Sequence, residues 1–150
     1  MAIIKVTDHY LEKRNVKDIK HFKPVVRHKL NQCLRNVKLQ VDATPYIATI
    51  TKTTIGKLSS AQYKTQPVSE FKRRAEIALV LPQIVPLLQN ITHQTNKKPL
   101  TRQGLSEVIK GDITVKYKNT KYKPTIVIKI FSNGDVLLYD ITNVGRKIER

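Results

Sequence analysis

Residues 125–142 carry the strongest folding signal in the chain. Two apolar runs, TIVIKIF (125–131) and VLLYDIT (136–142), flank the tetrapeptide SNGD, which contains Asn133-Gly134. An Asn-Gly pair between such runs is typical of a tight β-hairpin, because both turn positions favour positive φ angles. Residues 112–119 predict a strand before this hairpin, and residues 146–149 predict a last edge strand. Together these segments predict an antiparallel meander of about four strands.

The first seventy residues mix helical and extended patterns. Apolar residues recur at helical spacing over residues 24–38, which predicts an amphipathic helix with a basic outer face. Cys33 falls on the apolar face of this helix and is predicted to lie in the core. The alternating segment 46–55 predicts a strand or hairpin arm, and residues 56–69 predict a polar connection.

Three helices are predicted between Ser69 and Gly111. Ser69 is a candidate N-cap for a helix that continues to about residue 80. A second helix is predicted to begin near Pro82, because its early turns tolerate the missing N–H of a proline. Residues 92–99, THQTNKKP, predict a polar loop, and Thr101 is a candidate cap for a short helix that Gly111 ends.

Most helical segments precede most strands. That order predicts an α+β fold in which N-terminal helices pack on a C-terminal antiparallel β-sheet. The 150 residues are enough for one compact domain with a single core.

The chain contains 28 Lys and Arg against 11 Asp and Glu, a formal net charge of +17, and the basic excess is spread along the sequence. A folded basic domain most often binds a polyanion, and RNA or DNA is the usual one. An anionic membrane surface or an acidic protein are the competing partners. No apolar run reaches the roughly 18 residues of a membrane span. Cys33 is the only cysteine, which excludes a disulfide-stapled scaffold.

Motifs for cofactor and metal binding are absent from the sequence. It has no glycine-rich phosphate loop, no dinucleotide fingerprint and no CxxC or HExxH spacing. The carboxylates Asp112, Asp135 and Asp140 are too scattered to predict a two-metal nuclease. We therefore predict neither a metal site nor a cofactor.

A metal-free ribonuclease needs fewer groups, because RNA supplies its own nucleophile, the 2′-hydroxyl. The protein must provide a base, an acid and a cation for the charge that develops on phosphorus. His93 is the candidate histidine, since the predicted polar loop would let its pKa be tuned. The other catalytic candidates near the predicted sheet are Lys121, Tyr139, Thr142 and Arg146.

Basic residues elsewhere are candidates for contacting the RNA backbone, although a solvated surface explains such residues equally well. The candidate RNA-binding residues are Arg27, Arg35, Lys38, Arg73, Arg74, Lys97, Lys98 and Lys123. Tyr117, Tyr122 and Tyr139 could either stack on bases or fill the meander, which is the commoner fate of tyrosines in strands.

The segment FKRRAEIALVLPQIVPLLQNITHQTNKKP, the strand-rich tail and VLLYDITN near the end resemble the barnase–EndoU–colicin–RelE (BECR) group of nuclease folds. The likeness is greatest to versions found in phage head proteins and polymorphic toxins, and it covers roughly residues 70–150. It implies a metal-independent RNase, often acting on tRNA in the cytoplasm, that is secreted or delivered within a larger toxin. An acidic immunity protein would neutralise it.

The resemblance implies active residues at His93 and on the last strands, at Tyr139, Thr142 and Arg146. No histidine follows the final strands, so a barnase-like Glu/His pair is not matched. Residues 1–69 lie outside the resemblance, as an N-terminal helix/strand extension or entry region to the nuclease domain 70–150.

The sequence thus favours a metal-independent endoribonuclease toxin domain that cleaves RNA by 2′-OH transesterification. A non-catalytic RNA- or DNA-binding protein of phage or ribosome-associated type is the first alternative. An interaction module for an acidic protein is the second.

Overall fold

The computed structural model describes residues 3–7, 11, 18–41, 44–62, 64–95 and 104–148. Their strands form a six-stranded sheet of order β2-β3-β9-β8-β5-β4 and a three-stranded sheet of order β1-β6-β7. The strands of the large sheet are β2 (Lys38–Gln40), β3 (Ile47–Thr49), β4 (Gln89–Thr95), β5 (Leu105–Asp112), β8 (Thr125–Phe131) and β9 (Val136–Thr142). Those of the small sheet are β1 (Ile3–Val6), β6 (Thr114–Tyr117) and β7 (Thr120–Tyr122).

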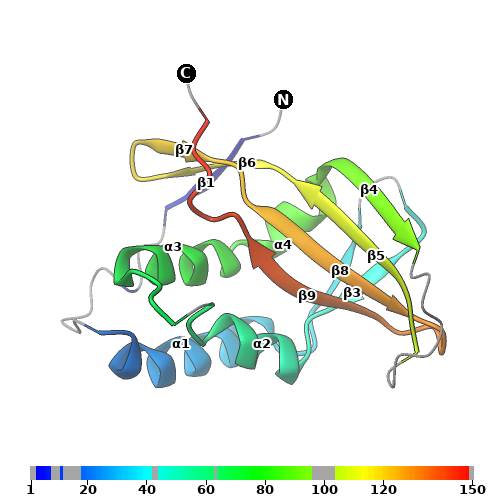
Figure 1. The fold of residues 1–150 in the computed structure, drawn as a ribbon, viewed down its shortest axis with the longest axis horizontal. Helices are drawn as coiled ribbons and strands as arrows, with labels where there is room; N and C mark the ends of the chain where they lie inside the picture. Colours follow the sequence, from blue (N-terminus) through cyan, green and yellow to red (C-terminus); the bar gives the residue numbers. More distant parts are fainter. Residues whose placement is uncertain are drawn as a thin grey trace.

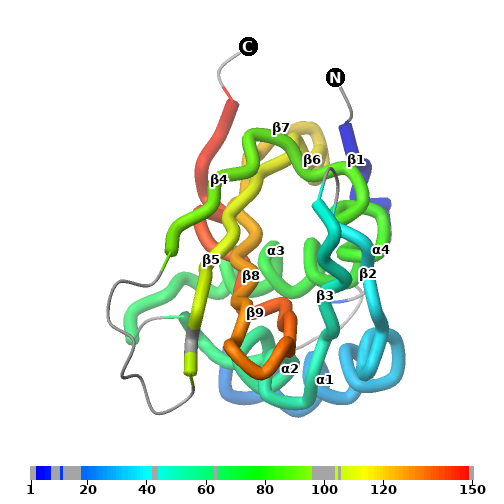
Figure 2. Tube along the Cα trace, turned by 90° about the vertical axis from the view of Figure 1, so that its right-hand side faces the viewer, coloured from blue at the N-terminus to red at the C-terminus, as the bar shows by residue number. Residues whose placement is uncertain are grey.

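The helices lie together on one side of the large sheet, and the small sheet lies next to the helix at Val68–Ala78 (Figure 1). They are α1 (Ile19–Leu34), α2 (Lys52–Leu58), α3 (Val68–Ala78), α4 (Leu81–Ile84) and a short 3-10 helix at Val85–Leu87. The large sheet is curved, so that β4 and β5 lie on one side of the molecule and β2 and β3 on the other (Figure 2).

The predicted α+β class is confirmed, with helices mostly before the C-terminal strands. The described residues contain more strands than the predicted four, because β1, β2 and β3 precede or separate the helices. β1 pairs in parallel with β6, and β3 in parallel with β9. Residues before and after position 70 therefore share both sheets and one hydrophobic core.

The β8–β9 hairpin begins and ends at the predicted residues, but its turn differs from the prediction. Gly134 has a φ of 97°, whereas Asn133 is not among the residues with positive φ. Phe131 N–H donates to Asp135 O at 2.9 Å, and Gly134 N–H donates to Phe131 O at 2.9 Å. This is the longer type of hairpin loop in which only the glycine needs a left-handed backbone.

Helix α1 begins at Ile19, not at Pro24, because Asp18 accepts a capping hydrogen bond from His21 N–H at 2.9 Å. Pro24 lies inside the helix, where burial of Phe22 and Val26 offsets the hydrogen bond that it cannot donate. The buried residues follow a spacing of four. Cys33 lies one residue off that row and is exposed, so its predicted core position is wrong.

The predicted strand over residues 46–55 is also wrong in its second half. Strand β3 ends at Thr49, and the Thr51 hydroxyl accepts a hydrogen bond from Thr54 N–H at 3.3 Å, which caps helix α2. The run of β-branched residues therefore contains a helix start. Threonine serves both purposes, since its propensity favours strands and its hydroxyl caps helices.

The helix predicted near Pro82 does begin there, as α4 and the 3-10 helix, but it ends at Leu87, earlier than predicted, and the short helix predicted before Gly111 is replaced by strand β5. The chain leaves the 3-10 helix at Leu88 and forms β4, which pairs with β5. His93 accordingly lies in a strand, not in a loop. Gly111 lies within β5, where an added Cβ would come within 3.3 Å of Gln89 O. The glycine therefore allows the backbone of β4 to pass close to β5, and it does not end a helix. The predicted cap Thr101 lies outside the described residues.

The strand predicted over residues 112–119 is confirmed in shortened form, because β6 covers Thr114–Tyr117. In place of a last edge strand, Lys147 makes an isolated antiparallel bridge with Tyr122. Among the described residues no helix is long and apolar enough to cross a membrane.

Candidate functional site

A cavity of about 410 Å³ lies where helix α2 meets the β8–β9 hairpin. The α2 side supplies threonines and Lys57, and the hairpin side supplies Tyr139 and the turn residues. The lining residues are Thr51, Thr53, Thr54, Lys57, Phe131, Asn133, Asp135, Leu137, Leu138 and Tyr139.

Helix α2 is held at this position by hydrogen bonds to the edge of β9. β3 pairs with β9 only at Thr49↔Leu137, so the rest of that edge is left for the helices to cover. The Thr54 hydroxyl donates to Leu138 O, and Arg74 Nε of α3 donates to Ile141 O at 3.1 Å. These hydrogen bonds provide donors to two strand carbonyl groups that would otherwise be buried without a hydrogen-bond partner.

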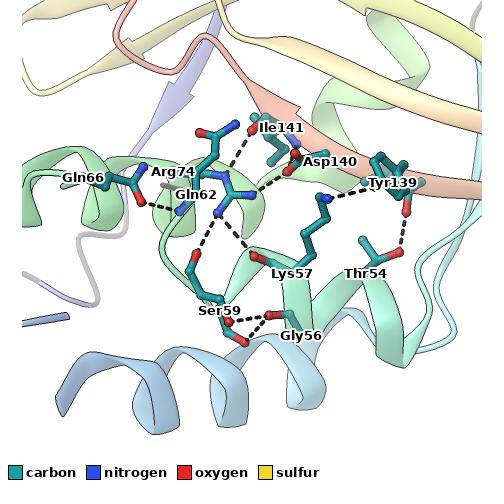
Figure 3. Close-up of polar contacts among 12 residues, drawn as sticks. Thr54, Gly56, Lys57, Ser59, Gln62, Gln66, Arg74, Tyr139, Asp140 and Ile141 are labelled. Atoms are coloured by element: carbon teal, nitrogen blue, oxygen red, sulfur yellow. Dashed lines mark hydrogen bonds and ion pairs between the residues drawn. The ribbon is translucent and has the colours of Figure 1, made fainter. Parts of the chain in front are cut away.

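Arg74 is the centre of this arrangement (Figure 3). Its guanidinium contacts Asp140 Oδ1 at 2.5 Å and also donates to Ser60 O at 3.1 Å and Lys57 O at 3.4 Å. Its side chain is 1% exposed. The prediction that Arg74 faces solvent and binds RNA is therefore wrong, because each side of the guanidinium is used within the core. Arg74 instead ties the C-terminal end of α2 to β9.

Tyr139 lies between two lysines at the mouth of the cavity. Lys57 Nζ donates to the Tyr139 hydroxyl at 3.0 Å, and Lys129 Nζ lies 3.4 Å from the centre of the ring. A β-bulge shifts the β8–β9 register between Val127 and Ile128, so Tyr139 has no direct partner across the ladder. Such a bulge re-aims a side chain, here towards Lys57 and Lys129.

The two ammonium groups change the acidity of the phenol. The hydrogen bond from Lys57 lowers the pKa of Tyr139 below its usual value, and the nearby charge of Lys129 adds to this, while burial opposes it. A phenolate that persists at lower pH can accept a proton. The same two cations can bind a phosphate group. Tyr139 and Lys57 line the cavity, and Lys129 adds a second cation at the Tyr139 ring.

We expect one tyrosine of this protein to ionise below the ordinary tyrosine pKa of about 10. Its ionisation should appear as an early phase, at lower pH than the other tyrosines, when phenolate absorbance in the ultraviolet is followed against pH. This phase should be absent in Tyr139→Phe. Lys57→Met should move the phase to higher pH, because the phenolate loses its hydrogen-bond donor. An early phase that persists in Tyr139→Phe would assign it to another residue.

His93 lies on β4 beside Glu107 of β5, with Nδ1 2.5 Å from Oε1, and its side chain is 46% exposed. The hydroxyl of Tyr46 lies 3.5 Å from the other oxygen of Glu107. His93 pairs with Ile109, whereas Lys129 pairs with Val108. Since neighbouring residues of a strand point to opposite faces, His93 and Lys129 lie on opposite faces of the sheet. The structure does not bring His93 together with Tyr139.

Thr142 and Arg146 lie near Asp112, at the other end of the large sheet. Thr142 pairs with Thr125, which in turn pairs with Asp112. Arg146 is 3.4 Å and Lys123 is 4.0 Å from the Asp112 carboxylate. This carboxylate partly neutralises the two cations. Lys123 and Arg146 thus meet at a carboxylate, and Thr142 lies two strands away in the same register, apart from the cavity.

The other predicted residues are dispersed. Lys121 lies exposed on β7 of the small sheet. Arg73 is half-buried, donates to Val144 O at 2.7 Å and covers the ring of Tyr122 at 4.4 Å. Tyr117 and Tyr122 are buried, which removes them as stacking platforms for bases. Arg27, Arg35 and Lys38 are exposed, and Lys97 and Lys98 lie outside the described residues.

Sequence reasoning missed Lys57 and Lys129. Lys129 interrupts the apolar run TIVIKIF, and a single charge within such a strand is a usable signal for a residue on the exposed face. Lys57 carried no comparable signal, because its helix was predicted as strand and turn.

Among the residues that the structure describes, no three His, Cys, Asp or Glu side chains gather as ligands for a metal ion. Comparison with known proteins gives no match to this chain among family models, curated sequences or solved structures.

Proposed function

We propose that the protein is a metal-independent endoribonuclease whose active site is the cavity at Tyr139. The observation that carries this proposal is the placement of Tyr139 between Lys57 and Lys129, beside a cavity of about 410 Å³ that Tyr139 and Lys57 line. The net charge of +17 supports RNA as the polyanionic substrate. A toxin role and an acidic protein that neutralises it belong to the same proposal.

In this reaction the Tyr139 phenolate accepts the proton of an RNA 2′-hydroxyl. The 2′-oxygen then bonds to the adjacent phosphorus, and the bond from phosphorus to the 5′-oxygen of the next nucleotide breaks. The departing oxygen takes a proton from a lysine ammonium. The products are a 2′,3′-cyclic phosphate and a 5′-hydroxyl, so no water molecule is consumed in this step.

Lys57 and Lys129 provide the positive charge for the transition state. The pentavalent phosphorus carries more negative charge on its oxygens than the starting diester, so cations in fixed positions stabilise it selectively. The Arg74 contacts to α2 and β9 hold Lys57 in place before substrate arrives. Lys57 also lowers the pKa of the base, which links the two roles.

The lysine roles predict the effect of removing each cation. Lys57→Met and Lys129→Met should each lower the cleavage rate of an RNA oligonucleotide about 10²–10³-fold, the usual effect of losing one donor to a developing charge. Lys110→Met is the matched control, because Lys110 is an exposed lysine of β5 that is paired with Val127.

We expect Lys110→Met to cleave within a few-fold of the wild type. Equal losses in all three variants would show only a general effect of charge and contradict the assignment. RNA that is bound but never cut by the wild type would support the alternative of a non-catalytic RNA-binding protein.

A further inference from the structure

Three lysines lie side by side across the three-stranded sheet. Lys5 of β1 pairs directly with Lys116 of β6, and Lys116 pairs directly with Lys121 of β7. Residues in direct register lie on the same face, and adjacent strands are about 4.8 Å apart. The sheet therefore presents a continuous row of three ammonium groups, which we call the lysine row.

The lysine row is not balanced by acidic residues of its own sheet. Strands β1, β6 and β7 read IIKV, TVKY and TKY and contain no Asp or Glu. Within the described part of the chain, no ion pair involves Lys5, Lys116 or Lys121. Like charges directly opposite in a sheet are destabilising. An anion that binds to the row would reduce this repulsion between the lysines.

We propose that the lysine row is a second binding site for the phosphate backbone of single-stranded RNA. This inference rests on the proposed function, because it gives a place to the part of the substrate that lies outside the cavity. Two observations favour RNA over a membrane or an acidic protein. The row is linear, as the phosphates of a strand are. Further positive charge lies beside the row: Lys123 lies between β7 and β8, and Arg146 donates to Lys123 O at 3.1 Å, with Asp112 neutralising these two cations only in part.

The lysine row and the cavity are separated by the length of strand β8. This strand has 7 residues, or about 20 Å at roughly 3.4 Å per residue. Strand β7 ends at Tyr122, so the row lies beyond Thr125, the first residue of β8. Phe131, the last residue of β8, lines the cavity. A dinucleotide in the cavity cannot reach the row. A longer strand that occupies the cavity can contact both.

The test measures how RNA affinity depends on salt. The probe is a single-stranded RNA longer than the roughly 4–16 nucleotides that one single-strand-binding fold covers, with 2′-O-methyl groups throughout so that it cannot be cleaved. The row variant combines Lys5→Gln, Lys116→Gln and Lys121→Gln. The control combines Lys20→Gln, Lys52→Gln and Lys64→Gln, which removes the same charge from exposed lysines of three separate segments.

The row variant should reduce the slope of log affinity against log salt by about 2, since each phosphate contact on a single strand contributes about 0.7. The control should change the slope by less than about 0.7, the contribution of one phosphate contact. The melting temperature of the row variant should equal or exceed that of the wild type, because the repulsion between the lysines is gone. If the triple variant unfolds, Lys121→Gln alone should lower the slope by about 0.7.

Equal slopes in the row variant and the control would overturn the proposal. It would also be overturned if the RNA slope stayed unchanged while the row variant lost binding to phosphatidylserine vesicles. Cleavage of a dinucleotide separates this proposal from the catalytic one, because the row variant should cut it at the wild-type rate. A wild type that cuts no RNA but shows the predicted slopes would leave the lysine row standing and the catalytic proposal refuted.

Discussion

Tyr139→Phe should lower the rate of RNA cleavage by about 10²–10⁴-fold, the usual contribution of a general base. The substitution removes only the hydroxyl that Lys57 contacts at 3.0 Å, and the aromatic ring stays beside Lys129. The affinity for 2′-O-methyl RNA should change little, because both lysines keep their charge. The cleavage assay and the binding assay together separate loss of the base from loss of binding.

Tyr46→Phe is the matched control for this substitution. Tyr46 also places its hydroxyl near a charged group, at 3.5 Å from Glu107, but on the side of the sheet where His93 lies. It should cleave RNA at the wild-type rate. If Tyr46→Phe and His93→Ala abolish cleavage while Tyr139→Phe does not, the active site is the His93–Glu107 pair and our assignment is wrong.

Arg74→Met should destabilise the fold strongly. It would leave the Asp140 carboxylate buried without its partner and would remove donors from Ile141 O and Ser60 O. Breaking a buried pair in this way typically costs about 3–5 kcal/mol. That is a large part of the roughly 5–15 kcal/mol by which small domains are stable. Urea unfolding measures the loss directly.

Arg73→Met tests whether this cost belongs to the buried pair. Arg73 is the next residue of the same helix but is only half-buried, so its removal should cost clearly less. Arg74→Met combined with Asp140→Leu should recover part of the loss, because no unpaired charge is then left in the core. A double variant less stable than Arg74→Met alone would contradict the view that the orphaned carboxylate causes the destabilisation.

The part of the fold that could be predicted is the part whose signals are local. The β8–β9 hairpin was predicted because its apolar runs and its glycine turn lie within eighteen consecutive residues. Strand β5 was mistaken for a helix because its apolar residues Leu105, Val108 and Ile109 lie at the helical spacing i, i+3 and i+4. Its conformation is decided by pairing with β4 and β8, and such long-range contacts leave no local pattern.

The same limit applies to the candidate site. Tyr139 was predicted from its strand, but its contact with Lys57 depends on packing of α2 against β9 across 82 residues of sequence. Arg74 looked like a surface residue beside Lys72 and Arg73, because a run of cations usually faces water. Only the pairing with Asp140, in a strand much later in the chain, shows that it is buried.

The most direct test of the account is to incubate the purified protein with RNA in EDTA and identify the ends of the products. The chemistry at Tyr139 predicts discrete fragments that carry 2′,3′-cyclic phosphate and 5′-hydroxyl ends. RNA that stays intact, or fragments that carry 5′-phosphate and 3′-hydroxyl ends, would contradict it.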